Sequence, residues 1–240
     1  KGRNQFWEVY NRATTSSEWL ALKITASESN ILLPSEYDSL KNEMTEDAWR
    51  QEMECDFDAA IPGAIWGREL YQAEQEHRIT EVPYDKEMPV HTVWDLGYSD
   101  DTAIWFYQVI HGEVHVIDYY ASSGKEIAHY AAQVLTKPYK FGIHHLPHDA
   151  RAKTLASGGK SIIEQLSLKI PIKCMRIVPN LSLQDGIQAT RMMLLRSWFD
   201  PKCEEGIECL RQYQREYDED KKAFRQTPRH DWTRDRKSVV

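Results

Sequence analysis

Two aspartates follow short apolar runs of the sequence, a placement that is typical of metal sites. Asp95 lies near the end of the run Val90–Leu96, and Asp149 comes three residues after the run 141–146. A buried carboxylate is costly unless hydrogen bonds or a cation compensate its charge. Two or three carboxylates at one point suit Mg²⁺ or Mn²⁺, which are hard cations that prefer oxygen ligands. Two such ions about 4 Å apart can activate water and stabilise the leaving oxygen in phosphodiester cleavage.

The same aspartates have a simpler interpretation as turn residues. Asp100 and Asp101 add negative charge to the loop after Asp95, but Asp side chains in a solvated loop commonly cap the backbone. Taken alone, the motif around Asp95 supports both interpretations equally. Asp149 favours a metal site only together with Asp95, so the metal hypothesis requires both carboxylates to meet at one edge of a sheet.

Three histidines near the second aspartate suggest a zinc site at first sight. They are His144, His145 and His148. Successive strand residues point to opposite faces, so His144 and His145 cannot both face one ion. We therefore interpret these side chains as surface or core imidazoles.

The segments that must position the aspartates predict an α/β fold. Strands are expected at 90–96, 103–109, 114–120, 141–146 and 174–178. The first three are close in sequence and rich in β-branched and aromatic residues, so they predict an antiparallel meander, whereas helical patterns separate the later ones. At the end, apolar spacing predicts a long helix that includes Trp198 and another that reaches Tyr217. Parallel strands joined through helices place their C-terminal ends on one edge, where ligands generally bind.

Composition and charge narrow the classes of protein. The 240 residues are enough for one sizeable domain and part of another, and 41% are hydrophobic, as in folded chains. The net charge of −7 argues against a strong stand-alone nucleic-acid binder, because Lys and Arg supply most affinity for phosphates, but it does not exclude a DNA enzyme. The four scattered cysteines predict neither a disulfide framework nor a zinc site. Since no apolar run approaches the roughly 20 residues that cross a bilayer, we expect a soluble protein of a reducing cytosol.

Several segments together resemble the tailed-phage terminase large subunit. The matching segments are Lys1–Tyr10, Asn30–Leu33, Trp49–Phe57, Trp94–Asp100, Leu146–Ala150 and Asp185–Ile187 with Arg191. The first three resemble the end of the ATPase domain of that family, the next two resemble the acidic motifs of its nuclease domain, and the last resembles the start of a later helix. The resemblance covers nearly the whole chain, and the ordered succession of motifs is far more specific than any one of them.

The resemblance implies a ribonuclease H-like mixed sheet flanked by helices, preceded by a helical and loop remnant of the ATPase domain. The expected parts are the ATPase remnant (1–60), a linker (61–89), the nuclease domain (90–233) and an atypical tail (234–240). The resemblance makes Asp95 and Asp149 the catalytic metal ligands of a nuclease that cuts concatemeric viral DNA. It also implies Mg²⁺ or Mn²⁺, with two ions expected.

Partners and location are implied in the same way. The expected partners are double-stranded viral DNA, the portal protein and the terminase small subunit, with a homo-oligomer during packaging and no membrane. The expected location is the cytoplasm of the infected or lysogenic bacterial host. Because the chain begins at Lys1 without a Met, we expect the ATP-binding motifs in a preceding part of the protein. We therefore predict that this chain alone does not hydrolyse ATP.

One departure from the family pattern concerns its third acid. In the family this acid follows a His-Asp-Trp-Ser/Thr stretch by a few residues. Here His230–Thr233 is followed by Arg234–Val240, so that a residue such as Ser238 stands in place of the acid. Asp231 and Asp235 are the candidate substitutes, and the sequence favours neither.

Two other functions stay open at this point. A catalytically inactive module that docks on DNA or on the portal ring through surface charge is one of them. Another ribonuclease H-like nuclease, such as a junction resolvase, also explains the two aspartates. That alternative leaves the motifs within Lys1–Phe57 unexplained.

Overall fold

The structure of the chain, a computed structural model, comprises two compact units. It describes residues 5–44, 46–57, 63–97, 102–153, 159–218 and 223–228. The first unit is formed by Lys1–Tyr71 together with Arg211–Arg229, and the second by Gln72–Leu210. The expected domain boundaries stay a prediction, and a helix, α5, lies within the residues expected as a linker.

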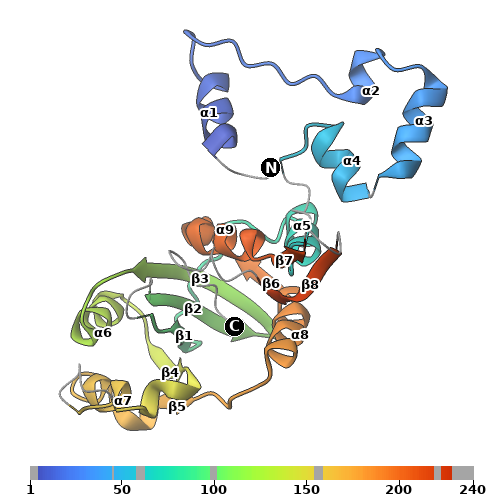
Figure 1. Cartoon of the computed structure of the whole chain (residues 1–240). Coiled ribbons are helices and arrows are strands. Elements are labelled where there is room, and N and C mark those ends of the chain that lie inside the picture. The colour runs from blue at the N-terminus through green and yellow to red at the C-terminus, as the bar shows by residue number, and fades with distance from the viewer. Residues whose placement is uncertain are drawn as a thin grey trace. The chain divides into compact units, whose positions relative to one another are not determined.

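The second unit contains most of the strands and the first unit most of the early helices (Figure 1). In chain order the elements are α1 (Gln5–Thr14), α2 (Ala26–Ser29), α3 (Pro34–Glu43), α4 (Glu46–Glu52), α5 (Gly67–Gln75), β1 (Val90–Asp95), β2 (Thr102–Ile110), β3 (Glu113–Ser122), α6 (Ile127–Thr136), β4 (Phe141–Leu146), η1 (His148–Arg151), α7 (Ile162–Leu166), η3 (Ile172–Cys174), β5 (Met175–Ile177), α8 (Leu183–Leu194), β6 (Ser197–Phe199), η4 (Pro201–Cys203), α9 (Glu204–Gln212), β7 (Arg215–Asp218) and β8 (Ala223–Pro228). Among the described residues, no helix combines the length and apolar character that crossing a bilayer requires.

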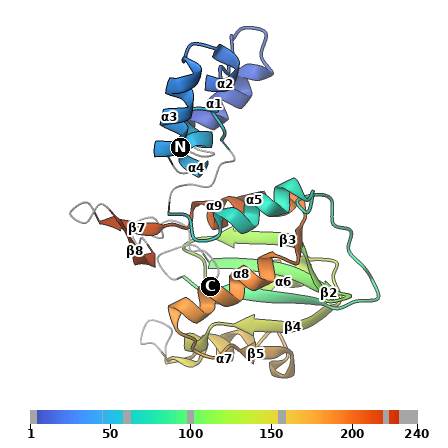
Figure 2. The same cartoon turned by 90° about the vertical axis from the view of Figure 1, so that its right-hand side faces the viewer.

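The second unit is built on a six-stranded mixed sheet with strand order β5-β4-β1-β2-β3-β6. Strand β2 runs antiparallel to both of its neighbours, whereas β1 and β4, β4 and β5, and β3 and β6 pair in parallel. Helices α6 and α8 lie on opposite sides of this sheet (Figures 1 and 2). The predicted ribonuclease H-like mixed sheet, with its antiparallel meander followed by strands joined through helices, is confirmed.

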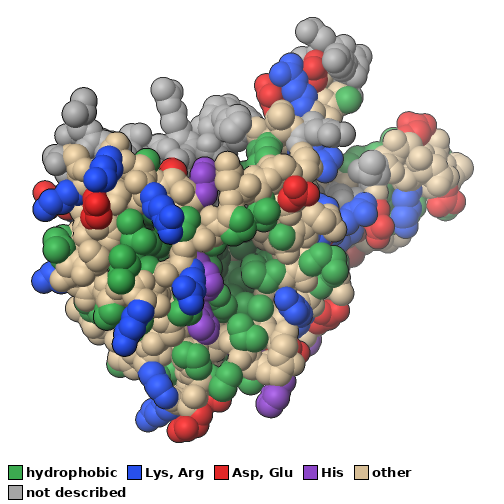
Figure 3. Space-filling view, turned by 90° about the horizontal axis from the view of Figure 1, so that it is seen from below, with side chains coloured by type: hydrophobic (Ala, Val, Ile, Leu, Met, Phe, Trp, Pro, Cys, Tyr) green, Lys and Arg blue, Asp and Glu red, His purple; other side chains and the backbone are tan. Residues whose placement is uncertain are grey.

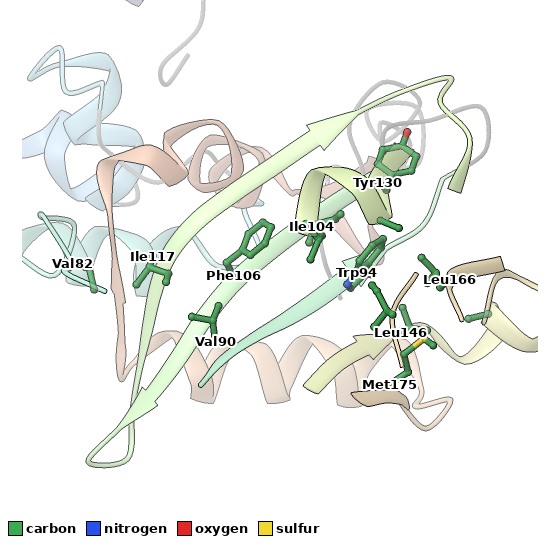
Figure 4. Close-up of a cluster of buried hydrophobic side chains, with 14 residues drawn as sticks. Val82, Val90, Trp94, Ile104, Phe106, Ile117, Tyr130, Leu146, Leu166 and Met175 are labelled. Carbon is green, nitrogen blue, oxygen red and sulfur yellow. The ribbon is translucent and has the colours of Figure 1, made fainter. Parts of the chain in front are cut away.

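The main core lies on the α6 side of the sheet (Figure 4). Strand β1 alternates strictly, with Val90, Thr92 and Trp94 buried and the residues between them half-buried. Tyr130 and Val134 of α6 are also buried and belong to the same core cluster. Because side chains alternate across a strand, this burial decides which residues of β1 face the other side.

The long helix expected around Trp198 ends earlier than predicted. Helix α8 stops at Leu194, and Trp198 lies in β6, which pairs with β3. The buried guanidinium of Arg78 donates to the carbonyl of Leu194 at 3.0 Å and to that of Ser197 at 2.6 Å. A side chain 116 residues away thus satisfies carbonyls at the end of the helix, which local apolar spacing cannot reveal.

The last expected helix is also shorter than predicted. Helix α9 ends at Gln212, and Tyr217 lies in β7, which forms an antiparallel hairpin with β8 in the first unit. Tyr213 stacks on Trp66 with ring centroids 4.9 Å apart, and its carbonyl accepts from the N–H of Ile65 at 2.9 Å. These contacts within the first unit replace the next helical turn.

Candidate metal site at the sheet edge

The two predicted site aspartates follow neighbouring parallel strands. Asp95 is the last residue of β1, and Asp149 lies in the turn η1, which follows β4. In the register of the two strands, Val93 lies opposite His145. Neighbouring strands are about 4.8 Å apart, so both aspartates belong to the same edge of the sheet. Strands β1 and β4 are thus neighbours in the sheet, which the metal hypothesis requires.

Asp95 faces away from the main core. It continues the half-buried set of alternate residues on β1, and its register partner on β2 is Ala103. The neighbouring Trp94 points into the core and is 2% exposed. A carboxylate on the more open face keeps part of its hydration, so its position there is less costly than a core position.

Asp149 lies on an exposed turn that is held by backbone hydrogen bonds and by the buried side chain of Ala150. The N–H of Ala150 donates to the carbonyl of Pro147 at 3.1 Å, and that of Ala152 donates to the carbonyl of Asp149 at 2.7 Å. Ala150 is fully buried and belongs to the main core cluster. The turn is therefore held by its backbone and one apolar side chain, while the Asp149 carboxylate stays at the surface.

A buried hydrogen-bond chain joins β1 to β4 just before the sheet edge. The indole Nε1 of Trp94 donates to Oγ1 of Thr92 at 2.7 Å, and the same oxygen lies 2.8 Å from Nδ1 of His144. Burial, together with the charges of His145 and His91, lowers the pKa of His144 to about 4. His144 is thus neutral near pH 7, and its Nδ1 can accept a hydrogen bond from the Thr92 hydroxyl, which joins the two strands that lead to the aspartates.

The sequence did not identify this chain of side chains. Thr92 occupies a core-facing position in an otherwise apolar run, and that is the signal that points to a buried polar partner. His144 is the partner, a buried core imidazole, and His145 is only half-buried. This difference follows the alternation that the sequence predicts for successive strand residues.

The structure brings two carboxylates to the edge and does not test the remaining candidates. Asp100, Asp101, Asp231 and Asp235 lie outside the described residues. Within the described ranges, no group of three or more His, Cys, Asp or Glu side chains is placed to hold a metal ion. The two described carboxylates are oxygen donors of the kind that Mg²⁺ and Mn²⁺ prefer, so their chemistry fits the expected ions. The metal assignment of both residues stays a prediction.

Comparison with solved structures identifies the fold. The large terminase of a thermophilic bacteriophage matches 90% of this chain with a TM-score of 0.50 and 14% sequence identity. The chain has the fold of part of a phage large terminase. It spans about half of that relative, which we call the thermophilic-phage terminase, covering 53% of its length. No model of a known protein family matches the sequence, and no curated protein matches it.

Two isolated terminase nuclease domains also match parts of the chain. The nuclease domain of the P22 large terminase matches 63% of this chain and 81% of its own, with 18% identity and a TM-score of 0.45. The large terminase nuclease of the thermophilic phage G20c, solved with bound cobalt, matches 70% of this chain and 88% of its own, with 10% identity and a TM-score of 0.46. At these identities, the likeness to known terminases concerns the fold alone.

Proposed function

We propose that the chain is the nuclease part of a phage terminase large subunit and cuts concatemeric viral DNA by metal-dependent hydrolysis of phosphodiester bonds. The observation that carries this proposal is the position of Asp95 and Asp149 after neighbouring parallel strands of a ribonuclease H-like sheet. The fold shared with the thermophilic-phage terminase supports it. The chemistry of the site decides the reaction, because a fold alone does not imply a function.

The described residues divide the work of the proposed site. Asp95 and Asp149 hold Mg²⁺ or Mn²⁺ through their carboxylate oxygens, with two ions as the expected number. When bound, such ions activate water and stabilise charge on the leaving oxygen of the phosphodiester. The bonds from Trp94 to Thr92 and from Thr92 to His144 join the two strands that lead to the acids, and they would keep these strands in register when metal binds. Asp231 or Asp235 is the proposed source of a third acid.

The wider role of the chain is part of the same proposal. Its partners are double-stranded viral DNA, the portal protein and the terminase small subunit, and it works as a homo-oligomer in the host cytoplasm. ATP hydrolysis belongs to another part of the protein. This chain covers 53% of the thermophilic-phage terminase, which leaves room in that relative for further domains.

A cleavage assay on plasmid DNA tests the proposed reaction. The chain is incubated with supercoiled plasmid and Mn²⁺ or Mg²⁺, and nicked and linear products are quantified. Asp95→Asn and Asp149→Asn keep the side-chain size and remove a metal-binding charge, so each is expected to lower the rate by at least about 100-fold. Chelation of the metal is expected to abolish cleavage of the wild-type chain.

The controls separate the nuclease from its alternatives. Glu113→Gln removes an exposed carboxylate at the start of β3 and is expected to cleave like the wild type. In a thermal melt, added Mn²⁺ is expected to raise the Tm of the wild type and not that of Asp95→Asn, because a ligand that binds only the native state stabilises that state. If Mn²⁺ does not change the Tm and no DNA is cleaved, the result indicates a docking module. If the chain cleaves branched DNA but not plasmid DNA, the result indicates a resolvase.

A further inference from the structure

Three aromatic rings form a cluster on the face of the sheet opposite the main core. We call His91 of β1, Tyr107 of β2 and His145 of β4 the ring cluster. The ring centroids of His91 and Tyr107 are 5.5 Å apart, those of His91 and His145 are 6.2 Å apart, and those of Tyr107 and His145 are 6.4 Å apart. All three side chains are half-buried, so each ring is partly open to solvent.

The cluster is held by the backbone of β4. The N–H of Ile143 donates to Nδ1 of His91 at 3.0 Å, so Nε2 carries the proton of the neutral ring. A Cβ on Gly142 would lie 2.8 Å from Cε1 of His91, and therefore only glycine lets this ring lie so close to the strand. Burial is the main cause that lowers the pKa of both His91 and His145. Both imidazoles are thus uncharged near pH 7 and present flat aromatic surfaces.

The ring cluster lies on the same face as Asp95 and next to a basic side chain. His91 and Asp95 are both half-buried alternate residues of β1, which places their side chains on one face. His145 is the register partner of Val93, which is two residues, or roughly 7 Å, before Asp95 along the strand. Arg176 of the edge strand β5 is exposed and is the register partner of His145.

The surface seen from below agrees with this arrangement. It is hollowed, and histidine and apolar side chains line the hollow (Figure 3). Lys and Arg side chains lie near the hollow, most of them on its left in this view, although the chain has a net charge of −7. Aromatic rings with flanking cations are the combination by which proteins bind single-stranded nucleic acid, since bases stack on rings and phosphates pair with Lys and Arg.

We propose that the ring cluster binds an unpaired base of a DNA strand, with Arg176 on a neighbouring phosphate, and guides that strand towards the Asp95 edge. The inference rests on the proposed nuclease function for the identity of its ligand. His91, Tyr107 and His145 are positioning residues in this scheme, because they touch the strand away from the reacting phosphate. The preferred DNA is therefore an end or an opened duplex, not an intact one.

Binding without metal tests the proposal independently of cleavage. A fluorescent single strand of about 16 nucleotides and a duplex of the same sequence are titrated with the whole chain in the presence of a chelator, and the Kd is obtained from anisotropy. His145→Ala is expected to weaken single-strand binding about tenfold, because one stacked base is lost. His145→Phe keeps an aromatic face and is expected to bind within about threefold of the wild type. Arg176→Gln is expected to reduce the salt dependence of binding by about one phosphate contact.

A matched control and a fold check keep the result clear. His115→Ala removes a half-buried histidine of β3 outside the cluster and is expected to leave the Kd unchanged. Each variant is melted, and because Arg176 is exposed its variant is expected to keep the wild-type Tm. An unchanged Kd for a folded His145→Ala chain overturns the proposal, as does equal weakening by His145→Phe. Asp95→Asn is expected to lose cleavage and to keep the wild-type single-strand Kd. Cleavage therefore tests the metal site, and the Kd tests the ring cluster.

Discussion

The two compact units of the chain stabilise themselves in different ways. The second unit buries a continuous core under its sheet, in which Val90, Ile104 and Phe106 are fully buried. In the first unit, α2 and α3 bury no described side chain, while Leu20 and Ile31 are each 82% exposed. The other large apolar side chains that are exposed in its N-terminal segment are Phe6, Val9, Trp19, Leu22, Ile24 and Leu33.

This difference shows that the apolar residues of the sheet are buried, whereas many of those in the N-terminal segment are exposed. A sheet presents a whole face to one layer of helices, so alternate residues of several strands share a core. Helices α2 and α3 of the first unit bury no side chain of their own, although the half-buried Tyr37 of α3 lies against the buried Trp49 of α4, with ring centroids 4.7 Å apart. Trp66 and Leu70 of the first unit are also fully buried, so the contrast concerns its exposed N-terminal segment. Apolar residues are therefore worth several kcal/mol in the sheet core and little in that segment, and substitutions can measure the contrast.

The largest expected effect comes from the sheet core. Phe106→Ala removes a fully buried ring and is expected to lower the free energy of unfolding of the second unit by about 3 to 5 kcal/mol. Leu22→Ala, in an exposed stretch of the first unit, is expected to change the free energy of unfolding of the first unit by less than about 0.5 kcal/mol. Urea unfolding followed by circular dichroism measures both. A comparable loss in Leu22→Ala would show that its side chain is buried by a contact in solution.

The next effect concerns the hydrogen-bond chain that fixes β1 to β4. Thr92→Val keeps the shape of the side chain but leaves the Trp94 indole N–H and Nδ1 of His144 without their shared partner. The expected cost is about 2 to 4 kcal/mol, because each buried polar group that loses its partner costs about 1 to 3 kcal/mol. Thr92→Ser keeps the hydroxyl and is expected to lose only about 1 kcal/mol. Equal losses in the two variants would contradict the role of the hydroxyl.

The third effect, smaller per pH unit than the two losses above, is a pH dependence of stability. The pKa of His144 is lowered to about 4 in the folded chain, so between about pH 6.5 and 4 the unfolded chain binds the extra proton. Stability therefore falls as the pH decreases through this window, by about 1.4 kcal/mol per pH unit for one such group. His144→Gln removes one titrating ring and is expected to reduce the slope of Tm against pH, while His91 and His145, whose pKa values are also lowered by burial, keep part of it.

Local patterns predicted much of the second unit. The runs around Asp95 and before Asp149 are strands, and the apolar spacing of α6 and α7 is helical, as expected. These elements follow from periodicity, because a strand or helix that must bury one face repeats its apolar residues at a fixed interval. The same patterns were wrong at Trp198 and Tyr217, where distant contacts end the helices.

The sequence by itself determined that two aspartates stand at strand ends and that a mixed α/β sheet carries them. Only the tertiary structure decided that β4 lies beside β1, that Thr92 and His144 join the two strands, and that His91 and His145 share one face with Tyr107. The physical reason is distance along the chain. Periodicity reports on neighbours within a few residues, whereas strand order and the pairing of polar and aromatic side chains depend on residues about 50 positions apart, which meet only when the whole core is buried.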